Sequence, residues 1–544
     1  MTERITLEQG HKRNLVEVLR NRCDVVGDRR WIVDGDRVVT YHDADLQSTR
    51  LAHGLSNLGV AAGDNVLVLL PNCVNFVYSW CAIAKLGAVH VPLNTAARGE
   101  LLKYQINNSA AKVILVDEGL LDRVEQISTG LESIAVCIVQ SKGASEQDLR
   151  QRAPGLAQRC GIVGLSELFS DKTSTLPSRS AYREIGSIIY TSGTTGASKG
   201  VMAPHAHAFG YARAVTMALD IEVSDINLTA LPLFHVAGLW AGPYASALTG
   251  TTCVIVDSFH ASTFWSDVAR YGATTTFLLG SMASFLYRRP EVEEDAQTPM
   301  AKVLMAPLIP EVQQFKRRFG VRVSTAYSLT EVGGCGAIHV LDLPNATSCG
   351  RPIEEMCEIK IVDADDEVVE DGVVGEIVVR PNEPWSTMQG YWRQPDKTLE
   401  AWRNLWFHTG DLGTRDHDGN LYFIDRIKDA IRRRGENISS VEVENEILRH
   451  PGVLECAVIP VSSEDTEQEI MAVIVPHENV QVTAEEIVRF LDGRLAYFMV
   501  PRFIEITSTL PKTETGKVQK AVLRQRGLSS AVWDRCAAGI KLSR

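Results

Sequence analysis

Residues 190–200 read YTSGTTGASKG and combine glycines, hydroxyl side chains and one lysine in a short stretch. Glycines let a backbone approach a ligand closely, and hydroxyl and amide N–H groups are donors that surround phosphate oxygens. The spacing is not that of a Walker A loop, because Gly193, Gly196 and Lys199 are three residues apart and Gly200 follows the lysine. The apolar run IGSIIY before it predicts a buried strand, which disfavours a flexible linker. The stretch therefore predicts a phosphate-binding loop.

Four other short strings carry residue types suited to chemistry. They are LPLFHVAG at 231–238, AYSLTE at 326–331, WFHTGD at 406–411 and PKTETGKVQK at 511–520. Long ordinary sequence separates them, and each alone is weak evidence. Thr-Gly-Asp is an ordinary turn, and a lysine beside a glycine is usually solvated. Their meaning depends on whether the fold can bring them together.

Composition limits the classes of protein that these strings could serve. A chain of 544 residues is too long for one ordinary core, so at least two domains are expected. The net charge of −12 disfavours a nucleic-acid partner, since phosphate backbones require a basic surface. Eleven scattered cysteines without a CxxC pair predict reduced thiols in a cytoplasmic protein, and the N-terminus has no apolar run typical of a secretory signal. The most apolar segment, residues 65–93, is interrupted by polar residues and predicts a core, not a membrane span.

Hydrophobic periodicity predicts the elements that must position the strings. NVLVLL, the helical stretch NFVYSWCAIAKLG and AVHVPLN form a β-α-β unit of a mostly parallel sheet. Similar alternation in AKVILVD, TTCVIVD and TTTFLLG extends this α/β pattern over the first two-thirds of the chain. Between about 350 and 425 the pattern changes to that of hairpins, in CEIKIVDADDEVVEDGVVGEIVVR and GNLYFIDR. This part is expected to be a β-rich subdomain.

A smaller unit follows IDRIKD. It has a helix SSVEVENEILRH, strands VLECAVIPV and IMAVIVP, a helix TAEEIVRFLDGRLA and a strand RFIEI, with Ser439 or Ser440 as the cap of the first helix. We therefore predict an α/β protein with an N-terminal domain at 1–428, including the β-rich subdomain at about 350–428, and a small mobile α+β domain at 429–544.

Together and in this order, the five strings resemble those of the adenylate-forming enzymes, a superfamily of acyl- and aryl-CoA synthetases, luciferases and amino-acid adenylation domains. The resemblance covers nearly the whole chain, from VVTYHDAD through KLGAVHVPLN and GEIVVRP to IDRIKDAIRRRGENIS. It implies that a carboxylate attacks the α-phosphate of ATP to give an acyl-adenylate and pyrophosphate, after which a thiol takes the acyl group. ATP, Mg²⁺ and coenzyme A are the implied cofactor and substrates, and a homodimer is common among such enzymes.

The resemblance also implies a set of nucleotide-binding residues. The β- and γ-phosphates would be held by Thr191, Ser192, Gly193, Thr194, Thr195, Gly196 and Lys199. Tyr327 would stack on adenine, Thr330 would donate to the α-phosphate and Glu331 would bind Mg²⁺. Asp411 and Arg426 would hold the ribose, because a carboxylate accepts two donors from a vicinal diol. Ser328 stands where the family more often has glycine.

Further residues are assigned to the reaction itself by the same resemblance. Lys517 would stabilise the charge that gathers between carboxylate and α-phosphate. Lys428 would be the hinge about which the C-terminal domain rotates. Gly435, Glu436 and Asn437 would then face the thiol's tunnel. Ser440 occupies a position where the family frequently has proline.

The sequence says less about which acid is the substrate and which thiol accepts the acyl group. His235 stands where amino-acid adenylation sites have aspartate, which speaks against an α-amino acid as substrate. The resemblance implies that His235 is a gate or wall beside the carboxylate, and the alternative is a core histidine. The pocket is expected to include His235, Val236, Gly238, Gly333 and Gly334, with the apolar segments FLLGSMASF and LMAPLIP, and to suit a hydrophobic or weakly polar acid. GENISSVEVENEILRHP is similar to the branch of carnitine, crotonobetaine and bile-acid CoA ligases.

Coenzyme A is the expected acceptor, since only 27 residues follow Lys517 and these leave no room for a fused carrier domain. Two alternatives stay open. One is a free-standing adenylating enzyme that loads a separate carrier protein or oxidises its adenylate. The other is a catalytically inactive relative, which would be expected to lack Lys517 or Glu331.

Overall fold

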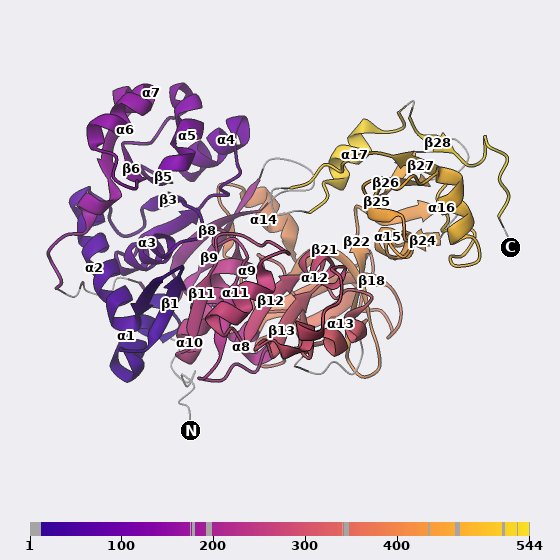
Figure 1. Cartoon of the computed structure of the whole chain (residues 1–544), viewed down its shortest axis with the longest axis horizontal. Helices are drawn as coiled ribbons and strands as arrows, with labels where there is room; N and C mark the ends of the chain where they lie inside the picture. Colours follow the sequence, from indigo (N-terminus) through magenta and orange to yellow (C-terminus); the bar gives the residue numbers. More distant parts are fainter. Residues whose placement is uncertain are drawn as a thin grey trace.

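Two large sheets form the first two-thirds of the protein, in a computed structural model that describes residues 12–174, 176, 180–191, 198–339, 341, 347–433, 436–462, 468–513, 517–529 and 531–542 (Figure 1). One sheet has the order β19-β9-β8-β4-β3-β5-β6-β7. Its strands are β3 (Asn65–Leu69), β4 (Val89–Pro92), β5 (Val113–Asp117), β6 (Val136–Gln140), β7 (Gly161–Gly164), β8 (Ile185–Thr191), β9 (Lys199–Pro204) and β19 (Gly390–Tyr391). The associated helices are α3 (Val74–Lys85), α4 (Gly99–Ser109), α5 (Leu121–Gln126), α6 (Glu146–Arg152) and α7 (Pro154–Arg159). Strands β3 and β4 pair in parallel on either side of α3 in the chain, as the β-α-β prediction requires.

The second large sheet has the order β16-β15-β14-β13-β12-β10-β11-β1-β2. Its strands are β1 (Arg30–Asp34), β2 (Arg37–Thr40), β10 (Ile226–Thr229), β11 (Thr252–Ile255), β12 (Thr275–Leu279), β13 (Lys302–Ala306), β14 (Arg322–Tyr327), β15 (Ala337–His339) and β16 (Arg351–Pro352). The helices of this part are α1 (Leu15–Val26), α2 (Tyr41–Asn57), α8 (His205–Ala218), α9 (Val236–Leu239), α10 (Ala245–Thr249), α11 (Phe264–Tyr271), α12 (Gly280–Tyr287) and α13 (Val312–Phe319). The largest buried apolar cluster draws side chains from both sheets and from α2, α3 and α8. The two sheets therefore share one core.

The β-rich part is a sheet of antiparallel strands in the order β17-β18-β21-β20, with β22 paired to β21. Its strands are β17 (Cys357–Val362), β18 (Gly375–Pro381), β20 (Trp402–Arg403), β21 (Trp406–Arg415) and β22 (Leu421–Arg426), and α14 (Pro395–Ala401) precedes β20. The predicted hairpins are thus present, although the link between β17 and β18 is longer than a tight turn.

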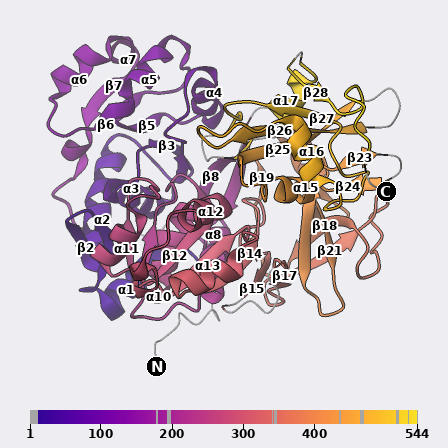
Figure 2. The same cartoon turned by 45° about the vertical axis from the view of Figure 1, so that its right-hand side comes forward.

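The remaining residues form a separate lobe, drawn in orange to yellow at the right of Figure 1 and seen above β18 and β21 in Figure 2. It contains β23 (Ile431–Arg433), β24 (Glu436–Ile438), α15 (Ser440–Ile447), β25 (Val453–Ser462), β26 (Gln468–Pro476), α16 (Ala484–Leu491), β27 (Phe503–Ile506), α17 (Lys520–Arg526) and β28 (Trp533–Asp534). Ser439 is the residue that caps α15, and its hydroxyl accepts from the Glu442 amide at 3.2 Å. Helix α16 ends earlier than predicted, at Leu491, because Gly493 adopts a positive φ of 79°.

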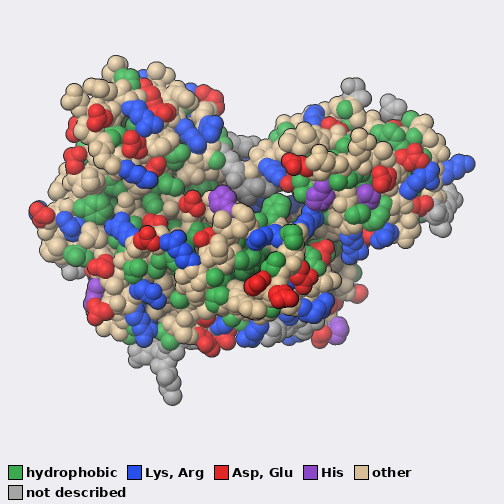
Figure 3. Space-filling view, viewed as in Figure 1, with side chains coloured by type: hydrophobic (Ala, Val, Ile, Leu, Met, Phe, Trp, Pro, Cys, Tyr) green, Lys and Arg blue, Asp and Glu red, His purple; other side chains and the backbone are tan. Residues whose placement is uncertain are grey.

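The predicted α/β fold class is confirmed, with a β-rich part and an α+β lobe. Acidic and basic side chains are interspersed over the face shown in Figure 3. Within the described ranges, each helix is too short or too polar to cross a lipid bilayer.

Candidate active site

The hairpin of β21 and β22 places Asp411 directly opposite Arg426. The Arg426 Nε lies 2.7 Å from the Asp411 Oδ1, and the Tyr327 hydroxyl donates to the Asp411 Oδ2 at 2.7 Å. Tyr327 is the last residue of β14, so two sheets meet at this carboxylate. Phe423 lies beside the Tyr327 ring, with centroids 6.3 Å apart. The structure thus brings together three residues that the sequence predicted for adenosine.

The ionised form of Asp411 is disfavoured by its burial. Only 2% of it is exposed, and burial raises its pKa to about 6 even though Arg426 and Tyr327 favour the ionised form. Its Oδ1 accepts no hydrogen bond of good geometry from the residues described. A buried carboxylate oxygen with spare acceptor capacity suits the hydroxyls of a ligand.

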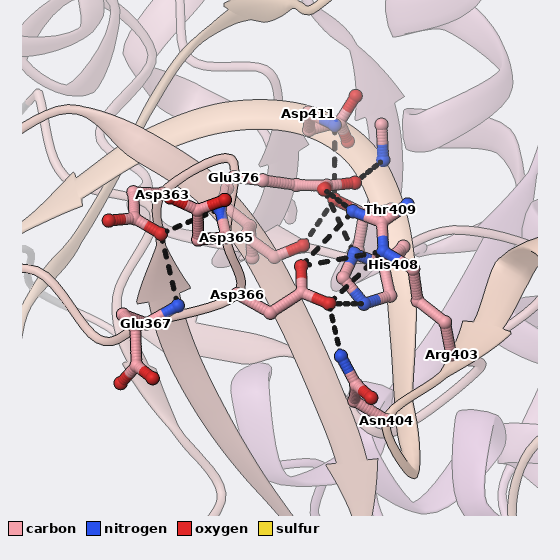
Figure 4. Close-up of polar contacts among 12 residues, drawn as sticks. Asp363, Asp365, Asp366, Glu367, Glu376, Arg403, Asn404, His408, Thr409 and Asp411 are labelled. Atoms are coloured by element: carbon pink, nitrogen blue, oxygen red, sulfur yellow. Dashed lines mark hydrogen bonds and ion pairs between the residues drawn. The ribbon is translucent and has the colours of Figure 1, made fainter.

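A polar network behind Asp411 fixes the strand that carries it (Figure 4). The Nδ1 of His408 lies 2.9 Å from a Glu376 oxygen, and the other Glu376 oxygen accepts from the Gly410 amide at 3.0 Å. The Thr409 hydroxyl donates to a β18 carbonyl at 2.7 Å and accepts from the Asp411 amide at 3.1 Å. Asp366, Arg403 and Asn404 complete the network. The residues before Asp411 in WFHTGD are therefore structural supports for it.

Glu331 and Lys199 both contact Tyr391. The Tyr391 hydroxyl donates to the Glu331 Oε1 at 3.0 Å, and the Lys199 ammonium lies 4.5 Å from the centre of the Tyr391 ring. Burial lowers the pKa of Lys199, while the Glu331 carboxylate opposes this. No group of three His, Cys, Asp or Glu side chains suited to a metal ion occurs in the described part of the chain. A cation here would take one carboxylate ligand, from Glu331, and complete its shell with phosphate oxygens and water.

Lys517 faces these groups from the C-terminal lobe. It lies in a hairpin in which Lys512 pairs antiparallel with Val518, the Thr513 amide donates to the Lys517 carbonyl at 2.6 Å and the Lys517 amide donates to the Thr513 hydroxyl at 3.1 Å. The residue is solvent-exposed, yet enough protein surrounds its ammonium that burial lowers the pKa of Lys517. Arg426 lowers it further, whereas Asp411 and Glu331 act in the opposite direction. Lys517 is therefore in electrostatic range of the predicted ribose, phosphate and metal contacts.

The loop before α9 positions His235. The Asn72 side chain donates to the carbonyls of Leu231 and Val256 at 3.0 Å each, and it accepts from the Leu233 amide at 2.8 Å. Gly238 allows the loop to fold back, because a Cβ there would lie 2.1 Å from the Pro232 carbonyl oxygen.

The surroundings of His235 determine the protonation state of its ring. Burial lowers the pKa of His235 to about 4, and Lys517 contributes in the same direction, so the ring is neutral at pH 7. Its Nδ1 accepts from the Ala237 amide at 3.2 Å. The proton is therefore on Nε2, which can donate to a ligand.

An apolar cavity of about 90 Å³ begins beside Tyr327. Gly333 and Gly334 line it, and a Cβ at Gly334 would lie 2.2 Å from the Gly210 carbonyl oxygen in α8. The rest of the lining is Tyr211, Ala214, Val215, Ala218, Phe277, Leu304, Ala306, Ala326, Ser328, Gly336 and Ile338. His235, Val236 and Gly238 are absent from this described lining and lie at the N-cap and in α9, so their part in the pocket stays a prediction.

Some predicted residues cannot be placed. Ser192, Gly193, Thr194, Thr195, Gly196 and Gly435 lie outside the described residues, as do the side chains of Glu436 and Asn437. Thr191 ends β8 opposite Lys199, Thr330 immediately precedes Glu331, and Lys428 is exposed just after β22. The roles predicted for these residues stay predictions.

Sequence reasoning missed three contributors. Neither Tyr391 nor Asn72 was assigned a role from the sequence. Helix α8 was not assigned to the pocket, although Tyr211 and Ala214 line the cavity. An aromatic residue beside glycine in GYW was the only local signal for Tyr391, and α8 carried none, because its largely apolar and buried sequence resembles that of many core helices.

Known protein families match the parts of the chain that contain most of these site residues. The sequence pattern of the family described as AMP-binding enzyme matches residues 19–392, and that of the AMP-binding enzyme C-terminal domain matches residues 442–517. The crotonobetaine/carnitine–CoA ligase of Citrobacter koseri is 30% identical over 528 residues, which cover 94% of this chain and 99% of that protein.

Solved structures are similar over nearly the whole length. The anthranilate CoA ligase AuaEII in complex with anthranoyl-AMP has a TM-score of 0.82 at 24% identity, covering 97% of this chain and 98% of that one. The O-succinylbenzoate CoA synthetase of Bacillus subtilis in complex with ATP and magnesium has a TM-score of 0.78 at 26% identity, covering 94% and 98%.

Proposed function

Because the chain belongs to the AMP-binding enzyme family and is an AMP-forming acid:CoA ligase that uses ATP, Mg²⁺ and coenzyme A, we propose that it works in two steps. In the first, a carboxylate oxygen of the acid attacks the α-phosphorus of ATP, and pyrophosphate leaves. In the second, the coenzyme A thiol attacks the acyl carbon, loses its proton and displaces AMP.

One observation carries the first step: Lys517 is in electrostatic range of Asp411, Glu331 and His235 at once. These residues come from β21, the turn after β14, the loop before α9 and the hairpin before α17. An ammonium at this point stabilises the negative charge that gathers as two anions meet, and it does so more in the transition state than in the separated reactants.

The other side chains divide the binding of ATP among them. The ionised Asp411 accepts the ribose hydroxyls, and Arg426 holds it in place while reaching the phosphates. Glu331 would hold Mg²⁺, which supplies charge neutralisation at the β- and γ-phosphates. Tyr391 orients the Glu331 carboxylate and leaves its second oxygen available to a ligand. Lys199, whose ammonium lies over the Tyr391 ring, would bind the same phosphates.

His235 is proposed to orient the acid. Its neutral ring would donate from Nε2 to the carboxylate or the α-phosphate without competing with Lys517 as a cation. The alternative of a core histidine is disfavoured, because the residue is only partly buried and lies in range of Lys517.

The cavity favours an acid that is short and carries no charge besides its carboxylate. The described lining carries no charged side chain, and its volume of about 90 Å³ is below the ~150 Å³ that holds a benzene in an engineered cavity. A trimethylammonium group would lose its hydration there without a carboxylate partner. We therefore propose a short aliphatic acid, in preference to the betaine substrates that the relative's name indicates, a dicarboxylate or a steroid side chain.

The test is an AMP-release assay with ATP, Mg²⁺ and a panel of short aliphatic, small aromatic, carnitine-like, long-chain and steroid-side-chain acids, each with and without coenzyme A. The expected result is AMP release that depends on coenzyme A and is largest for short apolar acids. Ala214→Leu, which narrows the cavity, should lower activity most for the longest acid accepted, whereas Ala62→Leu in an exposed turn should change nothing. Preference for carnitine would overturn the substrate class.

Pyrophosphate release that coenzyme A does not convert to a thioester would instead support a carrier-loading or oxidising enzyme. In our proposal, the second step follows rotation of the C-terminal residues about Lys428, with the boundary between 1–428 and 429–544. Gly435, Glu436 and Asn437 would then replace Lys517 beside the acyl group.

A further inference from the structure

The C-terminal lobe contacts β22 through the first residues of α15. The Ser440 amide donates to the Asp425 Oδ2 at 2.6 Å, and the Ser439 hydroxyl donates to the Ile424 carbonyl at 2.8 Å. Asp425 and Ile424 precede Lys428 in the chain, whereas both serines follow it. These two hydrogen bonds therefore join the segments on either side of the predicted hinge.

The hydrogen bond between Ser440 and Asp425 is shielded from water, because both residues are buried. Ser440 is 0% exposed and Asp425 is 2% exposed. The second Asp425 oxygen accepts from the Arg426 amide at 2.7 Å, so the carboxylate is bound by backbone donors on both sides of Lys428. Hydrogen bonds to a charged, buried acceptor are stronger than those between neutral groups.

A second set of contacts connects the junction to Lys517. The Lys520 ammonium donates to the Ser440 Oγ at 2.6 Å and lies 2.8 Å from the Glu444 Oε1. Burial opposes the charge on Lys520, but Glu444, Asp425 and Asp429 together raise its pKa. Arg524 of the same helix pairs with Asp429. Lys520 begins α17, three residues after Lys517.

We propose that Ser440, Asp425 and Lys520 form a latch that holds Lys517 in the adenylation position. Rotation about Lys428 would break the bond between Ser440 and Asp425, so the strength of that bond sets how readily the lobe leaves for the second step. Ser440, Asp425 and Lys520 act as positioning residues, since each acts through the segment that carries Lys517. The inference rests on the proposed two-step function.

Ser440→Pro is a sharp test, because the backbone already suits proline. Ser440 is the first residue of α15, where proline is well tolerated, and Ser439 has φ −73° and ψ 121°, in the region favoured before proline. The substitution removes the amide donor and the hydroxyl while leaving the helix. Ser440→Ala removes only the hydroxyl, and Thr483→Ala, which removes the cap of α16, is the matched control for a lost helix contact away from the hinge.

Three rates or signals separate the possible outcomes: ATP–pyrophosphate exchange for the first step, thioester formation from preformed acyl-adenylate for the second, and hydrogen exchange of β22, α15 and α16. We expect Ser440→Pro to lower the first rate about tenfold and Ser440→Ala about threefold, with the second rate unchanged or raised. Hydrogen exchange should become faster in β22 and α15 and stay unchanged in α16. Thr483→Ala should give the reverse exchange pattern and a normal ratio of the two rates.

An equal loss in both half-reactions, or unchanged exchange of β22 in Ser440→Pro, would overturn the latch. Failure of the proposed function is a different result, since the unaltered protein would then show no pyrophosphate exchange with any acid. Hydrogen exchange would still test the contact between Ser440 and Asp425 in that case, because it does not depend on activity.

Discussion

Asp411 and Asp425 lie on the two paired strands of one hairpin and are equally buried, with 2% of each exposed. Their surroundings are nevertheless opposite. Both Asp425 oxygens accept short backbone hydrogen bonds. Among the described residues, the Asp411 Oδ1 lies beside the Arg426 side chain but accepts no hydrogen bond of good geometry, and burial raises the pKa of Asp411 to about 6. A buried carboxylate that the protein satisfies serves the fold or its conformation, and one that the protein leaves partly unsatisfied serves a ligand.

The same contrast separates two lysines of the C-terminal lobe. Lys520 is fixed between Ser440 and Glu444, while Lys517 is exposed and in range of the predicted substrate contacts. The charge of Lys520 is thus paired with protein groups, whereas the charge of Lys517, three residues earlier, is left for the substrates. The predictions below test this division, beginning with the largest expected effect.

Lys517→Ala should lower the adenylation rate by about a hundredfold or more, because it removes the cation that stabilises the transition state. Lys520→Ala should have a smaller effect, of about tenfold, since it only loosens the position of Lys517. Lys512→Ala is the control within the same hairpin, because this lysine pairs with Glu455 on the lobe surface. ATP–pyrophosphate exchange measures all three, and an equal loss in Lys517→Ala and Lys520→Ala would contradict the division.

Asp411→Asn should raise the KM for ATP by about tenfold, because a neutral amide binds the ribose hydroxyls less strongly and leaves Arg426 unpaired. In the unaltered enzyme the KM for ATP should rise as pH falls through about 6, where Asp411 becomes protonated. Initial rates over a range of ATP concentrations and pH values measure both. A KM that is constant between pH 5 and pH 8 would show that Asp411 does not bind ATP as an anion.

Thermal unfolding should shift in opposite directions for the two aspartates. The folded pKa of Asp411 is raised from 3.8 to about 6, so the folded state binds the proton more tightly and its stability falls as pH rises between these values. At pH 8 Asp411→Asn should therefore raise the unfolding midpoint by a few degrees, and this gain should shrink towards pH 4. Asp425→Asn should lower the midpoint, because an amide group cannot accept from two backbone donors with both of its atoms. If the unfolding midpoint fell in both Asp411→Asn and Asp425→Asn, the proposed difference between the two carboxylates would be wrong.

Tyr391→Phe should have the smallest effect, a rise of about threefold in the Mg²⁺ concentration needed for half-maximal activity. The variant loses the hydroxyl that orients Glu331 but keeps the ring beneath Lys199. Tyr422→Phe is a matched control, since its hydroxyl binds the turn aspartate Asp416 at 2.8 Å, at the far end of the hairpin from Asp411. Equal Mg²⁺ dependence in the two variants would show that Tyr391 does not support the metal ligand.

Much of this protein could be predicted from its sequence. The comparisons confirm the adenylate-forming superfamily, the AMP-forming acid:CoA ligase class and the use of ATP, Mg²⁺ and coenzyme A. The β-α-β unit around α3, the hairpins of the β-rich part and the order of α15, β25, β26, α16 and β27 were also predictable, whereas β23, β24, α17 and β28 were not predicted. Period-2 and period-3.6 patterns, glycines and caps are local properties, so neighbouring residues are enough to indicate them.

Other features were decided by the tertiary structure alone. Asn72 joins two loops that are about 160 residues apart, Tyr391 meets Glu331 from another sheet, and α8 closes the cavity with residues that resemble any core helix. Ser440 is the clearest case, because the sequence indicated only a possible cap and a departure from proline. Its amide and hydroxyl acquire a role only where Asp425 and Lys520 approach them, and such contacts depend on packing between distant segments that no local pattern encodes.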